Sequence, residues 1–136
     1  MIVVTVIALL AAIVAPKVTN LIAKSKESNL KGSLSAMRSA VQIYYSGQEA
    51  FPGDLSDLAV NGTYLAAVPS ATIPPVSSQG SPGHDPASGI LLGDGAGPTD
   101  VAGGNAWYYV NTGGKTGSVF VNCTHLDTTG NAWTQN

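Results

Sequence analysis

Residues 1–46 have the sequence MIVVTVIALLAAIVAPKVTNLIAKSKESNLKGSLSAMRSAVQIYYS. Beyond Pro16 the apolar residues recur at spacings of three and four, apart from a gap at Lys26, which is typical of one helix face. These residues are Val18, Leu21, Ile22, Leu30, Leu34, Met37, Val41, Tyr44 and Tyr45. The pattern predicts one helix of about 46 residues that stops near Gly47 and spans roughly 69 Å. Such a helix is longer than a 136-residue globule needs, so about half of it is expected to protrude.

Charge divides the chain into two unlike parts. Residues 1–46 hold five of the six basic residues and one acid, for a local charge of +4, whereas residues 47–136 hold Lys115 against seven acids, for −6. The whole chain has a net charge of −2 and one Cys. This composition excludes an intrachain disulfide framework, a c-type haem and a generally basic nucleic-acid binder. The length predicts one domain.

The first 16 residues carry no charge, and only Thr5 and Pro16 lie outside the apolar set. An apolar run of this length fits a signal peptide, a shortened membrane span or a buried helix, and it is about a turn short of the roughly 20 residues that a span needs. We expect residues 1–28 to form a hydrophobic stem and residues 29–136 to form a head. The large apolar residues of the stem are Ile2, Val3, Val4, Val6, Ile7, Leu9, Leu10, Ile13 and Val14.

Pro16 is the residue most able to disturb the helix. Proline lacks an N–H group, and its ring crowds the carbonyl oxygen four residues earlier, so a bend is expected at this position. An ordinary membrane-helix kink and a hinge that matters for assembly both fit this position.

The rest of the chain predicts a small α+β head. A short helix is expected at 54–59, and residues 106–111 and 118–125 predict a β-hairpin, with Val119, Val121 and Cys123 on one face. A third strand is expected near Tyr64 or at the carboxyl terminus, because a lone hairpin is marginally stable. Residues 69–104 hold six of the eight prolines and eight of the sixteen glycines, which predicts a long surface loop. The residues expected to pack the antiparallel sheet against the helix are Leu30, Leu34, Met37, Val41 and Tyr44, and Trp133 is expected to pack back onto the sheet.

Residues 1–58 resemble the start of a mature type IV pilin or of a type II secretion pseudopilin. Those families open with an aromatic residue, a few apolar residues and a Glu, and continue as an apolar helix with a proline where Pro16 falls. The pairs Tyr44-Tyr45 and Phe51-Pro52 and the pattern Asp54-Leu55-x-x-Leu58 are similar to their helix-to-loop junction. The opening residues and the Glu are missing here, so about six residues are expected before Met1, which would complete a full span.

The resemblance implies a structural subunit and no enzyme. It implies a helical homopolymer in which the apolar residues of the stem form the filament core. Its partners would be further copies of the chain, prepilin peptidase, the inner membrane, and the pilus or secretion assembly machinery. The subunit would lie in the inner membrane before assembly and in an extracellular pilus afterwards. No nucleic acid is expected, because the basic residues would lie largely inside the filament.

Two alternatives to a pilus subunit remain open from the sequence. One is a major pseudopilin of a type II secretion system, which would form a short periplasmic piston. The other is a membrane-anchored periplasmic enzyme or binding domain, which would show a pocket lined by clustered polar residues. Genes for a secretin and a secretion ATPase beside this one would favour the pseudopilin.

Metal and catalytic chemistry find little support in the sequence. Asp94 and Asp100 flank a Gly-rich turn that resembles a calcium loop but lacks the alternating ligands of an EF-hand. The resemblance to pseudopilins, whose heads can bind calcium, keeps calcium as the one cofactor alternative. His84 and His125 lie far apart in the chain and are interpreted as solvated side chains. Cys123 is interpreted as a small buried residue, although His125 is close enough in sequence to act as a base.

Overall fold

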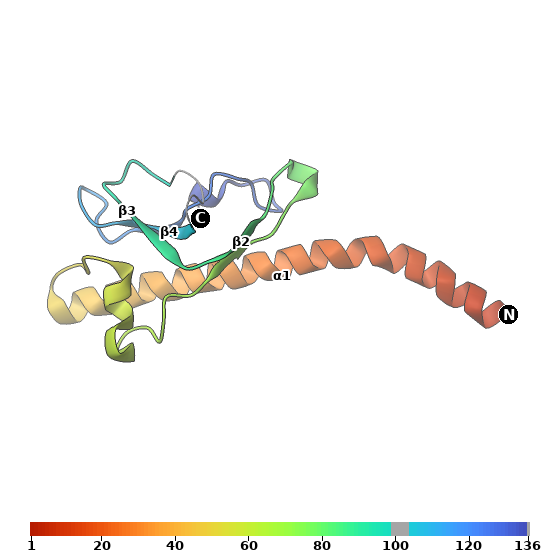
Figure 1. The fold of residues 1–136 in the computed structure, drawn as a ribbon, viewed down its shortest axis with the longest axis horizontal. Helices are drawn as coiled ribbons and strands as arrows, with labels where there is room; N and C mark the ends of the chain where they lie inside the picture. Colours follow the sequence, from red (N-terminus) through yellow and green to blue (C-terminus); the bar gives the residue numbers. More distant parts are fainter. Residues whose placement is uncertain (99–103, 136) are drawn as a thin grey trace.

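The computed structural model describes residues 1–98 and 104–135, and of the side chains at 15–17 and 19 nothing is described. The fold is α+β, with one long N-terminal helix, α1 (Ile2–Gln48), and two small β-sheets. The sheets and the connecting segments lie over the C-terminal half of the helix, whereas its N-terminal half extends away from them (Figure 1). The two halves of α1 therefore differ in packing, because only the C-terminal half is covered by the head.

Helix α1 confirms the length predicted from the apolar spacing. It contains 47 residues. It ends where Glu49 adopts a left-handed conformation with φ of 53°, and the Glu49 N–H group donates to the carbonyl oxygen of Tyr45 at 2.8 Å. This backbone bond closes the last turn and turns the chain back towards the head.

Within residues 1–98 and 104–135, five short strands form the sheets. β1 (Ala71–Ile73) pairs with β2 (His84–Ala87) in an antiparallel two-stranded sheet. β3 (Gly89–Gly93), β4 (Asn105–Val110) and β5 (Val119–Val121) form a second sheet in the order β3-β4-β5. The β4–β5 pair is antiparallel, which confirms the predicted hairpin, but β3 runs parallel to β4. The second sheet is therefore mixed.

The prediction of one long loop over residues 69–104 is wrong. This segment contains β1, β2 and β3 and the 3-10 helix η2 (Ser77–Gln79), while residues 99–103 lie outside the described part. The expected position of the third strand is also wrong, because β3 takes that place. At Gly93 the Tyr108 ring occupies the space that a Cβ atom would fill. Glycine here permits close packing within a strand and does not mark a loop.

The two faces of the hairpin follow the predicted alternation only as far as β5 extends. Val119, Val121 and Cys123 are buried, and Phe120 is half-buried on the other face. The alternation would place Asn122 on the same face as Phe120, but Asn122 is fully buried, and its Nδ2 donates to the carbonyl oxygen of Asn105 at 2.9 Å. The alternation stops because the strand ends at Val121.

The hydrophobic core lies between one face of α1 and the sheets. Trp133, in the 3-10 helix η3 (Trp133–Gln135), is buried in this core, as predicted. Arg38 ties the helix to β5, since its Nε and Nη2 atoms donate to the carbonyl oxygen of Val119 at 3.1 and 2.8 Å. The large core residues of the sheets and connecting segments are Leu55, Leu58, Ile73, Trp107, Tyr109, Val119, Val121 and Trp133.

The junction between the helix and the head uses the aromatic and acidic residues of the pilin-like pattern. Tyr45 stacks on Phe51 with ring centroids 4.5 Å apart. Asp54 caps the 3-10 helix η1 (Leu55–Gly62): its carboxylate accepts from the N–H group of Ser56, and its own N–H group donates to Asp57. These contacts fix the direction in which the chain leaves the helix.

Tyr109 gives the head a predictable response to alkaline pH. Its hydroxyl donates to the carbonyl oxygen of Pro52 at 2.7 Å, and burial, together with the carboxylates of Asp57 and Asp54, raises the pKa of Tyr109 to about 12. Because the unfolded chain has a tyrosine pKa of about 10, this contribution to stability is complete below that pH and is lost as the pH rises through the folded value. We expect Tyr109→Phe to lower the free energy of unfolding by about 1 kcal/mol at neutral pH.

Urea unfolding of the two proteins from neutral to strongly alkaline pH checks this prediction. The difference between wild type and Tyr109→Phe should shrink at alkaline pH, as the wild type loses the advantage of its bound proton. Tyr45→Phe is the matched control, because Tyr45 is partly exposed and its ring stacking survives the change. A difference between wild type and Tyr109→Phe that is independent of pH would contradict the assignment.

Candidate functional site

The N-terminal part of the predicted 1–28 stem, residues 2–14 of α1, is called the apolar stem below and is the largest exposed apolar feature of the described residues. Its nine large apolar side chains are between 49% and 81% exposed. They are Ile2, Val3, Val4, Val6, Ile7, Leu9, Leu10, Ile13 and Val14. Val18, Leu21 and Ile22 continue the exposed apolar surface towards the head. A soluble monomer rarely exposes a continuous apolar surface of this kind, which marks a binding surface.

The apolar side chains surround the stem on all sides. Ile2, Val3 and Val4 are consecutive, and consecutive helical residues point about 100° apart, so these three alone cover most of the circumference. A helix that is apolar all round is normally buried on every side, whereas a helix that packs on one partner has a single apolar stripe. The stem therefore fits an environment that encloses it, such as a bundle of helices or a lipid phase.

Within the described residues, no helix combines the length and the apolar character that a membrane crossing requires. α1 is continuous through position 16, and its N-terminal part curves away from the axis of the rest (Figure 1). The side chain of Pro16 lies outside the described set, and the hinge at this residue stays a prediction.

The helix residues that were expected to pack against the head lie in the core or at its edge. Leu30, Leu34, Met37 and Val41 are buried. Tyr44 is half-buried and meets the ring of Tyr64 edge-on, with centroids 5.2 Å apart. The head begins to cover the helix slightly before these residues, at Glu27, which is 5% exposed.

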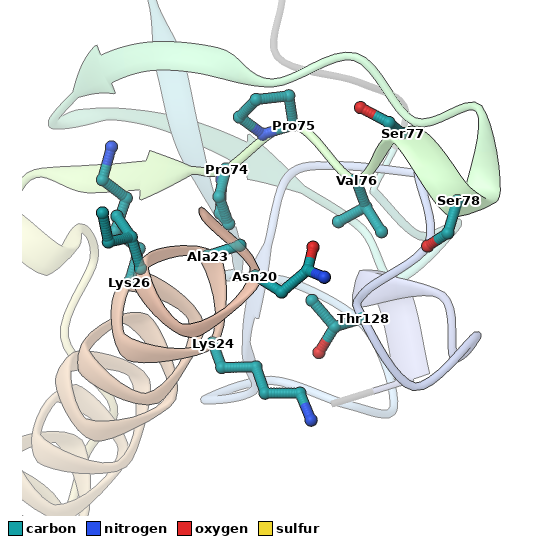
Figure 2. A pocket seen from close by; sticks show the side chains of 11 residues that line it. Asn20, Ala23, Lys24, Lys26, Pro74, Pro75, Val76, Ser77, Ser78 and Thr128 are labelled. Carbon is teal, nitrogen blue, oxygen red and sulfur yellow. The ribbon is translucent and has the colours of Figure 1, made fainter. Parts of the chain in front are cut away.

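A groove of about 530 Å³ lies where the exposed part of the helix meets the head. The helix contributes Asn20, Ala23 and Lys24, and the segment between β1 and β2 contributes Pro74 to Ser78. Figure 2 shows the Asn20 side chain directed towards Val76 and Thr128 across this space. The groove lies where the exposed apolar surface of the helix ends at Ile22, so a partner that encloses the helix up to this residue also meets this edge of the head.

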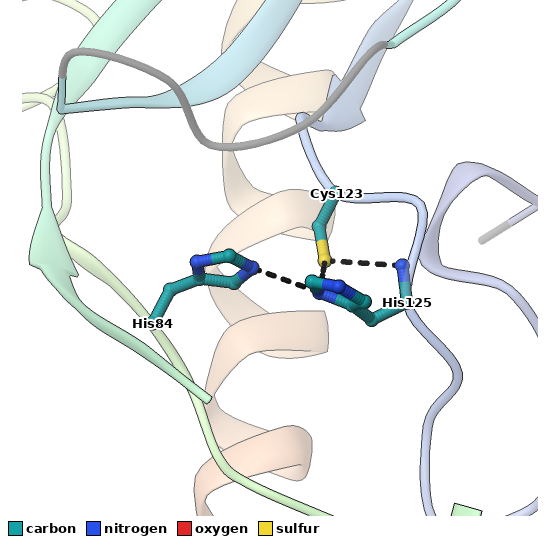
Figure 3. Close-up of side chains that lie close together, drawn as sticks. All are labelled: His84, Cys123 and His125. Carbon is teal, nitrogen blue, oxygen red and sulfur yellow. Dashed lines mark hydrogen bonds between the residues drawn. The ribbon is translucent and has the colours of Figure 1, made fainter. Parts of the chain in front are cut away.

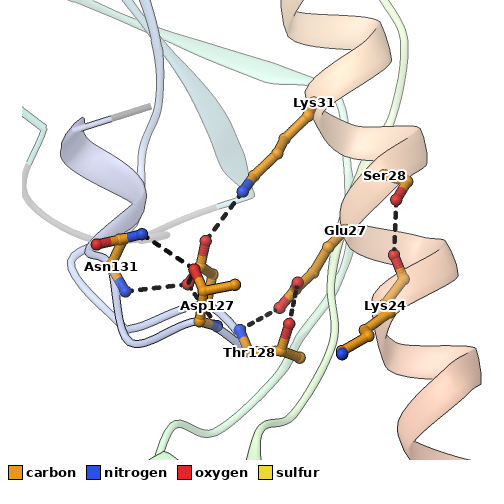
Figure 4. A network of polar contacts seen from close by, with 8 residues as sticks. Lys24, Glu27, Ser28, Lys31, Asp127, Thr128 and Asn131 are labelled. Atoms are coloured by element: carbon orange, nitrogen blue, oxygen red, sulfur yellow. Dashed lines mark hydrogen bonds and ion pairs between the residues drawn. The ribbon is translucent and has the colours of Figure 1, made fainter.

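A polar network joins the segment at 127–131 to the helix (Figure 4). The N–H group and the hydroxyl of Thr128 both donate to the carboxylate of Glu27 at 2.6 Å. Lys31 Nζ forms an ion pair with Asp127 at 2.9 Å. Glu27 is the only acid among residues 1–46, and the structure assigns it a partner inside the chain.

Asp127 is the centre of this network. Its side chain is fully buried, and one carboxylate oxygen accepts from the N–H groups of Thr129 and Asn131 and from the Thr129 hydroxyl. Burial alone would raise the pKa of Asp127, but the hydrogen bonds from Thr129, Lys31 and Asn131 outweigh it and hold the pKa well below its usual range. The carboxylate is therefore ionised at neutral pH and holds the segment in place.

Two histidines and the cysteine lie together, which corrects the interpretation of the histidines as separate solvated side chains. His84 on β2 reaches towards Cys123 and His125, which follow the end of β5 (Figure 3). His84 Nε2 lies 2.9 Å from His125 Nδ1, and Cys123 Sγ lies 3.4 Å from the same nitrogen. Cys123 is buried, as interpreted from the sequence, and both imidazoles are half-buried. The close spacing of Cys123 and His125 is the one feature of the sequence that pointed to this cluster.

In the acidic turn suggested for calcium, the Asp94 side chain bonds to the backbone of its own turn. Asp94 is exposed, and its Oδ1 accepts from the N–H group of Ala96 at 3.1 Å. Asp100 lies outside the described residues. Asp94 here acts as a turn-forming side chain.

Comparisons with protein-family models, with curated proteins and with solved structures find no match to this chain.

Proposed function

We propose that the chain is a structural subunit of a type IV pilus-like extracellular filament. Its apolar stems would pack against the stems of other copies and form the filament core, while the heads cover the outside. The observation that carries the proposal is the apolar stem: nine large apolar side chains, exposed and spread around the whole helix.

Burial of the stem supplies the driving force for assembly. At about 1.5–3 kcal/mol for each fully buried large apolar side chain, nine partly exposed residues contribute on the order of 10–20 kcal/mol per subunit. That sum is an upper estimate, and it still exceeds the net contribution of about 1 kcal/mol from a typical hydrogen bond. Contacts between stems would therefore dominate the association of subunits.

A bundle with several neighbours accounts for the all-round apolar surface better than a dimer does. One partner helix covers a single stripe, and the stem has apolar residues on every side. In a helical array each stem is enclosed by other stems, and the array repeats one contact without closing. Before assembly, the lipid of the inner membrane would give the same enclosure.

The charges fit this arrangement. The stem segment 1–16 is uncharged, and residues 47–136 carry −6. Two of the basic residues of the helix are engaged by the head of the same chain, Lys31 through Asp127 and Arg38 through Val119. The acidic head would then form the outer surface of a filament whose interior is apolar. The resemblance of residues 1–58 to pilins supports the same proposal.

Assembly on removal of detergent tests the proposal. The full chain is purified in a mild detergent, the detergent is removed by dialysis, and the product is followed by sedimentation and negative-stain electron microscopy. We expect long filaments of uniform diameter, with the heads still folded by tryptophan fluorescence. A protein that stays monomeric, or that inserts into added liposomes as single copies and forms no filaments, would refute it and would favour a membrane-anchored domain.

A further inference from the structure

A site for a metal ion is suggested by three side chains that the proposed filament core does not use. The chain brings His84, Cys123 and His125 together from β2 and from the segment that follows β5 (Figure 3). The two histidines are 41 residues apart in the chain. One ligand atom from each residue lies within 4.8 Å of the others. We propose that these three side chains bind one transition-metal ion of the Zn²⁺ class.

The distances are close to those of a metal site. Tetrahedral Zn²⁺ with bonds of about 2.0–2.1 Å to nitrogen and about 2.3 Å to sulfur places two nitrogens roughly 3.3 Å apart and a nitrogen and a sulfur roughly 3.6 Å apart. In the structure, His84 Nε2 and His125 Nδ1 are 2.9 Å apart, and Cys123 Sγ and His125 Nδ1 are 3.4 Å apart. Small rotations of the three side chains would therefore admit the ion.

The surroundings of the sulfur favour a thiolate ligand. The backbone N–H group of His125 donates to Cys123 Sγ at 3.4 Å. Hydrogen bonds of this kind stabilise a metal-bound thiolate and tune the site. Cys123 and His125 lie in the same short turn, so two of the three proposed ligands come from one segment of the chain.

A metal site explains the burial better than a catalytic cysteine does. Cys123 has 0% exposure, so its sulfur is closed to a substrate of ordinary size. His84 and His125 are each half-buried, which leaves the two imidazoles partly accessible to solvent. A small ion can enter between the imidazoles and reach the sulfur, whereas a nucleophile must meet its substrate directly.

The donor set selects the kind of ion. Two imidazole nitrogens and one thiolate suit borderline and soft ions such as Zn²⁺, whereas Ca²⁺ and Mg²⁺ require oxygen ligands. Three protein ligands leave a fourth tetrahedral position for water or for a group from outside the chain. The bound ion would link β2 to the segment after β5 and would stabilise the head.

Metal titration of the full chain in detergent, without a polyhistidine tag and after treatment with reductant and chelator, tests the proposal. Competition with a chromophoric chelator should show one Zn²⁺ per chain, and Tm should rise by about 10 °C with Zn²⁺ at a hundredfold excess over Kd. Co²⁺ in place of Zn²⁺ should give visible tetrahedral bands and a thiolate-to-metal charge-transfer band.

The variants separate binding from folding. His84→Gln changes a half-buried residue of a short edge strand and should weaken Zn²⁺ affinity by about two orders of magnitude. The apo protein should stay folded, with Tm lowered only by the loss of the His84 contact with His125. Cys123→Ser should abolish the charge-transfer band. Asp85→Asn, next to His84 and exposed, is the matched control and should bind Zn²⁺ like the wild type. Equal affinity in wild type and His84→Gln, or Co²⁺ spectra without the thiolate band, would overturn the proposal and leave a histidine pair beside a buried thiol.

Discussion

Leu9→Asp is expected to abolish filament formation while leaving the head folded. Leu9 lies in the middle of the apolar stem and is 63% exposed in the single chain, so the change does not disturb the core of the head. In an assembled filament the new carboxylate would be enclosed by apolar side chains, and an unpaired charge in such surroundings is strongly unfavourable. Filament mass after removal of detergent, measured by sedimentation, should fall to background.

Leu9→Met is the matched control for this experiment. Methionine keeps the volume and the apolar character of leucine, so filaments should form at close to the wild-type yield. Tryptophan fluorescence and Tm of the head should be the same in wild type and in both variants. Normal filaments from Leu9→Asp would show that the stem is not the surface that drives assembly.

Asp127→Ala is expected to lower the free energy of unfolding of the head by about 3 kcal/mol. The change removes the acceptor for the N–H groups of Thr129 and Asn131 and for the Thr129 hydroxyl, and it takes the partner from Lys31. All of these bonds end on one fully buried carboxylate, so the single substitution removes them together. Urea unfolding followed by tryptophan fluorescence measures the loss, since Trp107 and Trp133 are both buried in the head.

The carboxylate of Asp127 also makes the free energy of unfolding depend on pH in the acid range. Because its pKa in the folded protein is lowered, its contribution is complete above the unfolded value of about 3.9 and is lost as the pH falls further. The difference between wild type and Asp127→Ala should therefore narrow steadily in acid. Asp94→Ala, which removes one exposed turn bond, should cost less than about 1 kcal/mol. A loss of the same size in both variants would contradict the role given to Asp127.

The helix and the hairpin could be predicted because their signals are local. The spacing from Leu30 to Val41 marks a helix face, and the glycines between β4 and β5 mark a turn. Gly117 is one of them, and its φ of 90° favours glycine. A single segment of sequence contains all the information that these elements need.

The strands within residues 69–98 could not be recognised because their glycines and prolines have a non-local cause. Gly93 leaves room for Tyr108, and the space beside Gly83 is filled by Pro75. Pro86 sits in β2, where a two-stranded sheet has no neighbour that needs its N–H group. A composition that indicates a loop thus reflects close packing between strands that the sequence does not show to be adjacent.

The candidate metal site could not be predicted from the sequence for the same reason. His84 meets His125 only after β2 and the segment following β5 have packed in the head, and spacing along the chain carries no trace of that contact. Glu27 could have been noticed, because a single acid within a basic helix needs a partner, but its partner Thr128 lies 101 residues away.

The long separation between Glu27 and Thr128 also determines when the head can become stable during synthesis. The helix can form as soon as it is made, yet its partners arrive 96 and 101 residues later, with Asp127 and Thr128. Contacts of such sequence separation form slowly, because a long loop must close first. Until then Glu27 and Lys31 lack the partners that they have in the folded chain, so a nascent chain that ends before residue 127 lacks this closing contact. The head is thus completed only when the last residues of the chain have been synthesised.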